Sequence, residues 1–276
     1  MKTDEDLFGT IVIAWVVAVT ILFAILLPHT LNLPTLPALF FKAVSERPAV
    51  AEAPGSLAGQ PVAGGPEGLL VHYDFEDMTF AKNHVFRDSS GNSNNAVANG
   101  VFIATAPGVI GSTAVSLPGT GYLYAPTDPA AGRTNVSFTL WFTDTDETHN
   151  YLLAGALSSG TPRTGWLIGT RGSELWDEDG EPVRIAGGTR AAGTARFLPW
   201  NHKALVYNGT SVVEYLNGEI VSAYTASGKP LGEGRAMLIG SWQPFGFNYA
   251  GRIDDFRIYG RALDPREVTA LYRQGS

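Results

Sequence analysis

The sequence predicts an all-β protein, a sandwich of short antiparallel strands, preceded by one membrane-spanning helix. Three observations lead to this fold class. The 276 residues include 32 Gly and 17 Pro, which is typical of a protein with many turns and unusual for a helical one. Short apolar or alternating segments recur with turn residues between them. A long uncharged apolar stretch lies near the N-terminus.

The apolar stretch Leu7–Leu27 contains no charged residue. As a helix with a rise of ~1.5 Å per residue it is about 31 Å long, which matches the hydrocarbon core of a bilayer. A cleaved signal peptide is the alternative, but the preceding tail 1–6 is acidic and no small-residue cleavage site follows the stretch. We therefore expect an uncleaved anchor whose aromatic residues are Phe8, Trp15 and Phe23.

Residues 28–68 are rich in Pro, Ala and Gly and lack apolar periodicity, so they predict an extended, semi-rigid tether. Within the tether, residues 36–44 are apolar enough to lie along a membrane interface, with Phe40 and Phe41 inward and Lys42 reaching water. Packing of this segment on a neighbouring protein is an equally good interpretation.

Charge and cysteine content exclude several classes of function. The net charge is −7 and the basic residues are scattered, so no stripe of Lys and Arg is available for a phosphate backbone, and nucleic acid is not expected as a partner. The absence of Cys excludes disulfides, thiolate metal sites and a thiol nucleophile. It does not identify the compartment, because a protein on either side of a bacterial inner membrane can lack disulfides.

Residues 69–276 carry the signals of a β domain. Leu69–Phe75, Val136–Phe142 and Tyr151–Leu157 are predicted strands, and in the second the alternate residues Val136, Phe138, Leu140 and Phe142 share one face.

Two Asn-Gly pairs, Asn208-Gly209 and Asn217-Gly218, predict type I′ turns that divide one segment into three antiparallel strands. Near the C-terminus, Asp264, Pro265 and Glu267 have the spacing of an N-cap, a first-turn proline and a capping box. A short helix is therefore expected, with Val268, Leu271 and Tyr272 on the stripe that docks onto the sandwich.

These segments, in this order and over Leu69–Arg273, resemble the laminin G-like family of the concanavalin A-like lectin and glucanase superfamily. The resemblance implies a two-sheet antiparallel jelly roll whose rim loops bind sugars, proteins or calcium in different members. The matching pieces are HYDFED (72–77), RDSSGNSNNAV (87–97), GYLYAP (121–126), VSFTLWF (136–142), WNHKALVYNG and VVEYLNGE within 200–219, MLIGS (237–241) and YAGRIDDFRIYGRALDPREVTALY (249–272).

Glucanases of this superfamily carry acidic residues at alternate positions of one strand, so that the carboxylates point into the same groove. Asp177, Asp179 and Glu181 have that spacing. However, they lie in WDEDGEP, where Asp-Gly followed by Pro predicts a turn. Since no other catalytic motif occurs, we do not expect an enzyme.

Calcium is the one cofactor that the sequence suggests. The loop DSSGNSNN (88–95) is dense in oxygen ligands, and the resemblance implies a site formed by Asp88, Asn92 and Asn94, with Glu76 or Asp254 from neighbouring strands. The alternative is that the same residues serve only as tight-turn residues, which also favour Asp, Ser, Gly and Asn.

Aromatic residues are the candidate contacts for a ligand or partner. Trp242 and Phe245 lie in the predicted loop SWQPFGFNY, in which Tyr249 is expected to fill the core position, and Trp176 is the third candidate.

The first functional hypothesis is a non-catalytic accessory subunit of a larger membrane assembly, such as a photosynthetic reaction-centre, light-harvesting or respiratory complex. It would sit in the inner membrane with its C-terminal domain on the periplasmic side. This orientation follows from the resemblance, because the charges that flank the apolar stretch do not decide it. The alternative is a cell-surface carbohydrate-binding module, and a glycan hydrolase comes third.

Overall fold

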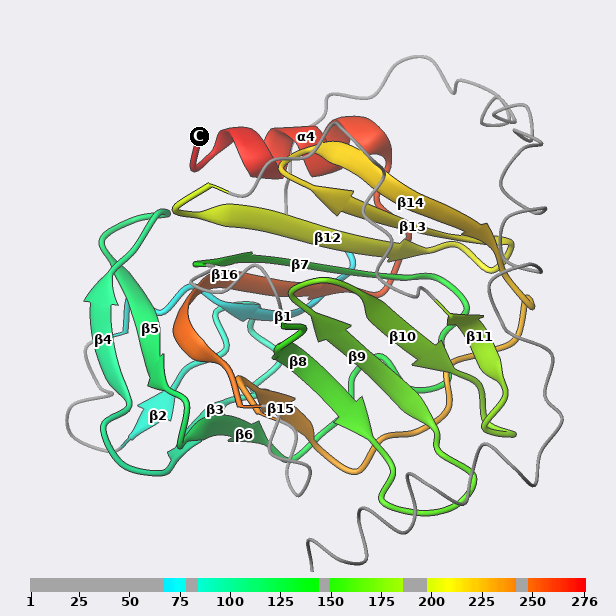
Figure 1. Ribbon diagram of the computed structural model, residues 1–276, viewed down its shortest axis with the longest axis horizontal. Coiled ribbons are helices and arrows are strands. Elements are labelled where there is room, and N and C mark those ends of the chain that lie inside the picture. The colour runs from blue at the N-terminus through cyan, green and yellow to red at the C-terminus, as the bar shows by residue number, and fades with distance from the viewer. Residues whose placement is uncertain (1–66, 78–83, 144–148, 186–197, 242–247) are drawn as a thin grey trace, which may run out of the picture. The chain divides into compact units, whose positions relative to one another are not determined.

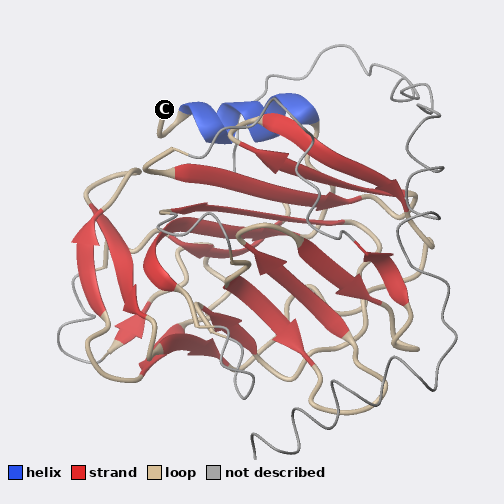
Figure 2. Ribbon diagram, viewed as in Figure 1, coloured by secondary structure: helices blue, strands red, loops and turns tan. Residues whose placement is uncertain are grey.

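The computed structural model describes residues 67–77, 84–143, 149–185, 198–241 and 248–276. They form two antiparallel sheets that pack face to face, with one short helix against the outside of the first sheet (Figures 1 and 2). The predicted all-β sandwich with a short C-terminal helix is confirmed. The predicted anchor at 7–27 and nearly all of the tether at 28–68 lie outside the described residues and stay predictions.

The first sheet, sheet A, has eight strands in the order β14-β13-β12-β7-β16-β5-β4, with β1 paired beside β16. Its bounds are β1 Leu69–Tyr73, β4 Ala104–Pro107, β5 Thr113–Pro118, β7 Val136–Phe142, β12 Asn201–Tyr207, β13 Ser211–Leu216, β14 Glu219–Thr225 and β16 Ala250–Tyr259.

The second sheet, sheet B, also has eight strands, in the order β11-β10-β9-β8-β15-β6-β3-β2. Its bounds are β2 Val85–Phe86, β3 Ala96–Asn99, β6 Tyr122–Ala125, β8 Leu152–Leu157, β9 Gly165–Gly169, β10 Ser173–Trp176, β11 Pro182–Ile185 and β15 Met237–Ile239.

The core lies between the two sheets and is built from alternate residues of their strands. Val136, Phe138, Leu140 and Phe142 of β7 all belong to it, as the alternation predicted. From the other sheet, Trp166 of β9 tilts against Phe138 with ring centroids 4.4 Å apart. This is the inter-sheet packing that holds a sandwich together.

The predicted three-strand meander is present as β12, β13 and β14. Asn217 and Gly218 both have positive φ, as the type I′ turn requires. The Asn208-Gly209 turn differs from the prediction, since only Gly209 of the pair has positive φ. The Asn208 side-chain oxygen instead accepts hydrogen bonds from the backbone N–H groups of Thr210 and Ser211, so this turn is built around a side chain.

The C-terminal helix α4, Pro265–Arg273, begins as predicted. Asp264 is its N-cap and forms a capping box with Glu267. Val268 and Leu271 are buried against the outer face of sheet A, and Tyr272 stacks on Trp141 with ring centroids 5.7 Å apart. The helix therefore covers apolar residues on the outer face of sheet A, the face that points away from the core between the two sheets.

Candidate ligand-binding site

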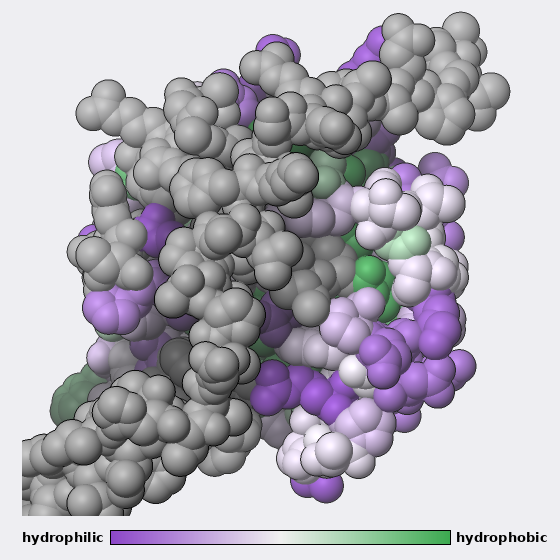
Figure 3. Space-filling view, turned by 45° about the vertical axis from the view of Figure 1, so that its right-hand side comes forward, coloured by the Kyte–Doolittle hydropathy of each residue, from purple (hydrophilic) through white to green (hydrophobic). Residues whose placement is uncertain are grey.

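A cavity of about 230 Å³ opens on the outer face of sheet B, over strands β8, β9 and β10. It is lined by Asn150, Tyr151, Leu152, Arg163, Leu167, Gly169 and Glu174. Figure 3 shows the side of the domain that faces right in Figure 1, where some apolar surface, in green, lies among polar residues in purple.

Strand alternation places the floor of this cavity. In β9, Trp166 and Ile168 point into the core, so Leu167 points outward. Glu174 of β10 is the cross-strand partner of Leu167 and shares its face. An apolar floor thus stands directly beside a carboxylate.

Asn150 is held at the rim by a backbone contact. Its side-chain oxygen accepts a hydrogen bond of 2.8 Å from the Arg171 N–H. A Cβ at position 169 would lie 2.3 Å from that oxygen, so only glycine leaves room for the Asn150 side chain. Gly169 therefore positions a polar group of the cavity.

Arg163 and Trp176 form the adjoining wall. The guanidinium carbon of Arg163 lies 5.4 Å from the centre of the Trp176 ring, within the range of a cation–π contact. Trp176 also packs on Leu152 and Leu167 and is only 9% exposed. It was expected as an exposed contact, but these neighbours cover it, and it packs beside the cavity floor on the same face of sheet B.

The sequence indicated Trp176 but not the residues that line the cavity. Alternation in GWLIG and SELW puts Leu167 and Glu174 on one face, yet nothing in either segment shows that this face is hollowed. The other expected contacts, Trp242 and Phe245, and the anchor aromatics Phe8, Trp15 and Phe23 lie outside the described residues.

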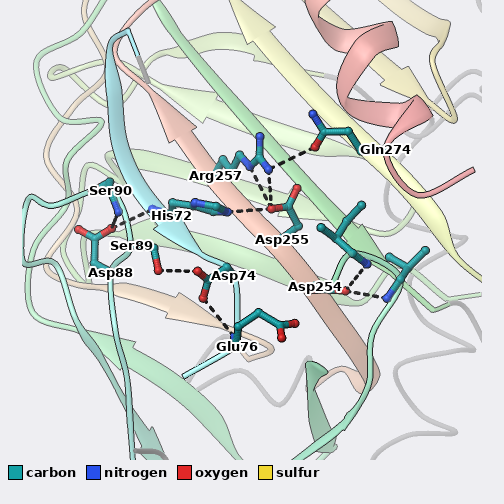
Figure 4. Close-up of polar contacts among 12 residues, drawn as sticks. His72, Asp74, Glu76, Asp88, Ser89, Ser90, Asp254, Asp255, Arg257 and Gln274 are labelled. Atoms are coloured by element: carbon teal, nitrogen blue, oxygen red, sulfur yellow. Dashed lines mark hydrogen bonds and ion pairs between the residues drawn. The ribbon is translucent and has the colours of Figure 1, made fainter. Parts of the chain in front are cut away.

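The residues expected to bind calcium fall into two hydrogen-bond sets. In the loop after β2, the Asp88 carboxylate accepts hydrogen bonds from the backbone N–H groups of His72 and Ser90 (Figure 4). It also accepts one from the backbone N–H of Asn94. The amide nitrogens of Asn92 and Asn94 donate to the backbone carbonyl of Leu70. These hydrogen bonds tie the loop to β1. They are typical of Asp and Asn in a tight turn, which was the alternative to a calcium site.

Glu76 and Asp254 form the second set, on the turn between β4 and β5. Glu76 accepts from the backbone N–H groups of Ser112 and Thr113, and one oxygen of Asp254 accepts from those of Val109 and Ile110.

The other Asp254 oxygen, Oδ1, is buried and has no hydrogen-bond partner, and burial raises the pKa of this carboxyl to about 6. An unpaired buried carboxylate oxygen fits a hard cation, so Glu76 and Asp254 are the residues that would hold calcium here. Across the described part of the chain, no three His, Asp or Glu side chains form a metal-binding group, so carbonyl oxygens would have to complete the site.

A third polar cluster lies beside this turn. The Asp255 carboxylate accepts from His72 Nε2 at 2.8 Å and from the Arg257 guanidinium, and Arg257 also reaches Gln274 (Figure 4). These groups join β1, β16 and the residues after α4, which gives the cluster a structural role.

The acidic residues considered for catalysis lie in the predicted turn between β10 and β11. Asp177 accepts from the backbone N–H groups of Asp179 and Glu181, and Lys229 pairs with Asp177 and Asp179. The three carboxylates therefore do not lie along one strand above a groove.

The fold and the sequence together define the class of protein. The family described as the concanavalin A-like lectin/glucanases superfamily matches residues 117–269, more than half of the chain. The chain belongs to this family. No curated protein sequence matches it.

Solved structures support the same fold. The binding domain of botulinum neurotoxin serotype G is 16% identical, with a TM-score of 0.56 over 74% of this chain and 50% of that one. The binding domain of Paraclostridial Mosquitocidal Protein 1 is 14% identical, with a TM-score of 0.53 over 74% and 52%. The chain therefore spans about half the length of these toxin domains.

Domain 4 of an extracellular GH43 arabinanase from Geobacillus stearothermophilus, solved with arabinotriose, is 24% identical over 74% of this chain and 98% of that one, with a TM-score of 0.49. A receptor-binding domain of botulinum neurotoxin type G is also among the similar structures, at 16% identity and a TM-score of 0.53. As for membrane segments, no helix in the described ranges is long and apolar enough to span a bilayer.

Proposed function

We propose that the domain is a non-catalytic binding module that holds one sugar unit of an oligosaccharide in the cavity on sheet B. The observation that carries this proposal is the lining itself, in which the polar groups of Asn150, Arg163 and Glu174 surround an apolar floor of Leu152 and Leu167. A sugar ring presents hydroxyl groups at its edge and C–H groups on its faces, so it requires both kinds of partner. Family membership permits this role without specifying it.

The size of the cavity restricts the ligand. At about 230 Å³ it is smaller than the ~300–1,000 Å³ typical of sites for drug-sized molecules. One sugar ring is therefore a better fit than a whole oligosaccharide, and the neighbouring units would extend into solvent.

A glycan array with the full chain, followed by calorimetry on the best ligand, tests the proposal. Glu174→Ala and Arg163→Ala should each weaken binding at least tenfold. Glu219→Ala, which removes an exposed carboxylate from β14 of the other sheet, is the matched control and should bind as the wild type does. A silent array across broad glycan classes, or unchanged affinity in Glu174→Ala, would reject the proposal.

We also propose, from the uncharged stretch Leu7–Leu27, that this module is anchored in a membrane as an accessory subunit of a larger assembly. Native electrophoresis after extraction in mild detergent tests this. A monodisperse monomer of 29.4 kDa would contradict it, whereas co-migration with other membrane proteins would support it.

A further inference from the structure

One end of the sandwich is built from a stretch without charge. Between Ser89 and Thr127 the sequence contains no Asp, Glu, Lys, Arg or His, although the chain has 26 acidic and 19 basic residues. The stretch includes the four strands β3, β4, β5 and β6 of the two sheets. The carboxylates of Glu76 and Asp254 lie on its β4–β5 turn, whereas the side chains of the stretch at the Ala104 end of β4 can be dehydrated without stripping water from an ion of their own.

Two apolar side chains protrude from this end. In the loop between β3 and β4, Val101 is 63% exposed and Phe102 is 84% exposed. Phe102 also has a φ of 64°, a left-handed conformation that a bulky residue rarely adopts. Backbone strain of this kind persists only where the surrounding structure imposes it, and it is concentrated at functional positions.

The base of the loop is fixed, which determines where its tip points. A Cβ at Gly100 would lie 2.7 Å from the Cα of Gly121, so the two backbones are in close contact. The Ile103 side chain lies against Gly121 and packs on the core. With both flanks of the loop held in this way, Val101 and Phe102 are presented to solvent by a rigid support.

Further apolar and aromatic surface continues from the tip onto sheet B. Val97 and Tyr124 are cross-strand partners, 44% and 40% exposed, and Tyr122 is partly exposed two residues away. We call Val97, Val101, Phe102, Tyr122 and Tyr124 the uncharged end. An aliphatic and aromatic tip flanked by tyrosines has the composition of a protein surface that sits at a membrane interface.

We propose that the uncharged end inserts its Val101–Phe102 tip into the interface of a bilayer of neutral, zwitterionic lipid. The net charge of −7 disfavours anionic lipid, and this end approaches the surface without bringing a charged side chain of its own stretch. A single small apolar anchor binds membranes only marginally, and stable attachment needs a second one. The second is the apolar stretch Leu7–Leu27, so this proposal shares the anchor with the proposed function.

The tether is long enough for both anchors to reach one bilayer. Gly68 precedes β1 at the Tyr259 end of β16, and the uncharged end lies near the Ala250 end, because Pro118 of β5 pairs there. The ten residues of β16 span about 34 Å at ~3.4 Å per residue. An extended polyproline-like chain of the length of 28–68 can span up to about 130 Å at ~3.1 Å per residue, which is more than this distance.

The absence of Cys allows a direct test in the full chain. Phe102→Cys, labelled with an environment-sensitive fluorophore, is reconstituted into phosphatidylcholine vesicles that contain spin-labelled lipid. Ile220→Cys is the matched control, since Ile220 is an exposed apolar residue of β14 outside the uncharged end. We expect a blue-shifted emission at position 102 and quenching by the lipid at least threefold stronger than at position 220.

A second variant separates insertion from an effect of the label. With the fluorophore on Val97→Cys, the additional change Phe102→Asp should reduce quenching to the control level, and glycan binding should be unchanged. Equal quenching at positions 102 and 220, or failure of the full chain to float with vesicles, would overturn the proposal. A blue shift at position 102 without lipid quenching would also overturn it and would assign this end to a protein partner.

Discussion

Tyr73 on β1 and Phe256 on β16 are cross-strand partners whose rings stack inside the core, with centroids 5.9 Å apart and planes 16° from parallel. The first and last strands of the domain are therefore neighbours. Phe75 continues the same aromatic cluster at 6.2 Å from Tyr73. The beginning and the end of the domain thus share one patch of core.

Phe256→Ala should lower the free energy of unfolding by about 3–5 kcal/mol, because it truncates a fully buried aromatic residue and leaves a cavity. Phe102→Ala is the matched control and should change stability by less than about 0.5 kcal/mol, since Phe102 is exposed. Denaturant titration of both variants measures the difference. A loss below about 1 kcal/mol for Phe256→Ala would show that this packing contributes little.

Glu214→Gln should be similarly destabilising, for an electrostatic reason. Lys203 Nζ lies 2.9 Å from the Glu214 carboxylate, both side chains are about 4% exposed, and Ser173 of sheet B donates to the same carboxylate. Loss of the negative charge leaves a buried ammonium without compensation, which costs about 3–5 kcal/mol. The double variant Lys203→Met/Glu214→Leu should recover most of that loss, and recovery of none would contradict this account.

His202 should make the protein sensitive to acid. Burial lowers the pKa of His202 to about 3, whereas in the unfolded chain it is near 6.5. Below pH 6.5 the unfolded chain binds a proton that the folded chain does not, so stability falls as the pH falls. The loss is about 2.7 kcal/mol at two pH units below 6.5.

Unfolding free energies between pH 7 and 4.5 test this sensitivity. The dependence on pH should be shallower in His202→Phe than in the wild type, because the variant lacks the group whose pKa burial lowers. Parallel curves for the wild type and His202→Phe would show that His202 does not titrate as described.

Calcium should stabilise the full chain if Glu76 and Asp254 hold it. A ligand that binds only the folded state adds about 2.7 kcal/mol at a hundredfold excess over its dissociation constant, which corresponds to a rise of roughly 5–10 °C in Tm. Excess chelator should reverse the rise. Asp254→Asn should abolish it, while Asp88→Ala should lower Tm but keep the calcium response. Equal midpoints with calcium and with chelator would remove the metal from this site.

Local structure was predicted correctly from the sequence where a short motif is compatible with only one backbone conformation. Asp264, Pro265 and Glu267 have little alternative to a helix start, and Asn217-Gly218 suits a turn with two positive φ angles. Asn208-Gly209 was assigned the wrong turn because its Asn side chain competes for the backbone N–H groups, which the dipeptide alone does not show.

The candidate site was less predictable from the sequence, because a cavity forms only where no other part of the chain packs over the outer face of the strands. Leu167 and Glu174 meet only when β9 and β10 pair in the observed register, and Asn150 reaches them from outside both strands. The loop around Asp88 shows the opposite case. Its composition suits both a cation and a tight turn, and the choice depends on the partners that β1 supplies.

The position of β16 in the sheet has a consequence for how the chain is made. β16 pairs with β7 and β5, and also with β1, yet it is the last strand to leave the ribosome. Until Tyr259 emerges, these three strands lack their shared neighbour and sheet A cannot close. Long-range pairing of this kind delays folding and leaves apolar strand edges exposed meanwhile. We therefore expect sheet A to close only when the synthesis of the domain is nearly complete.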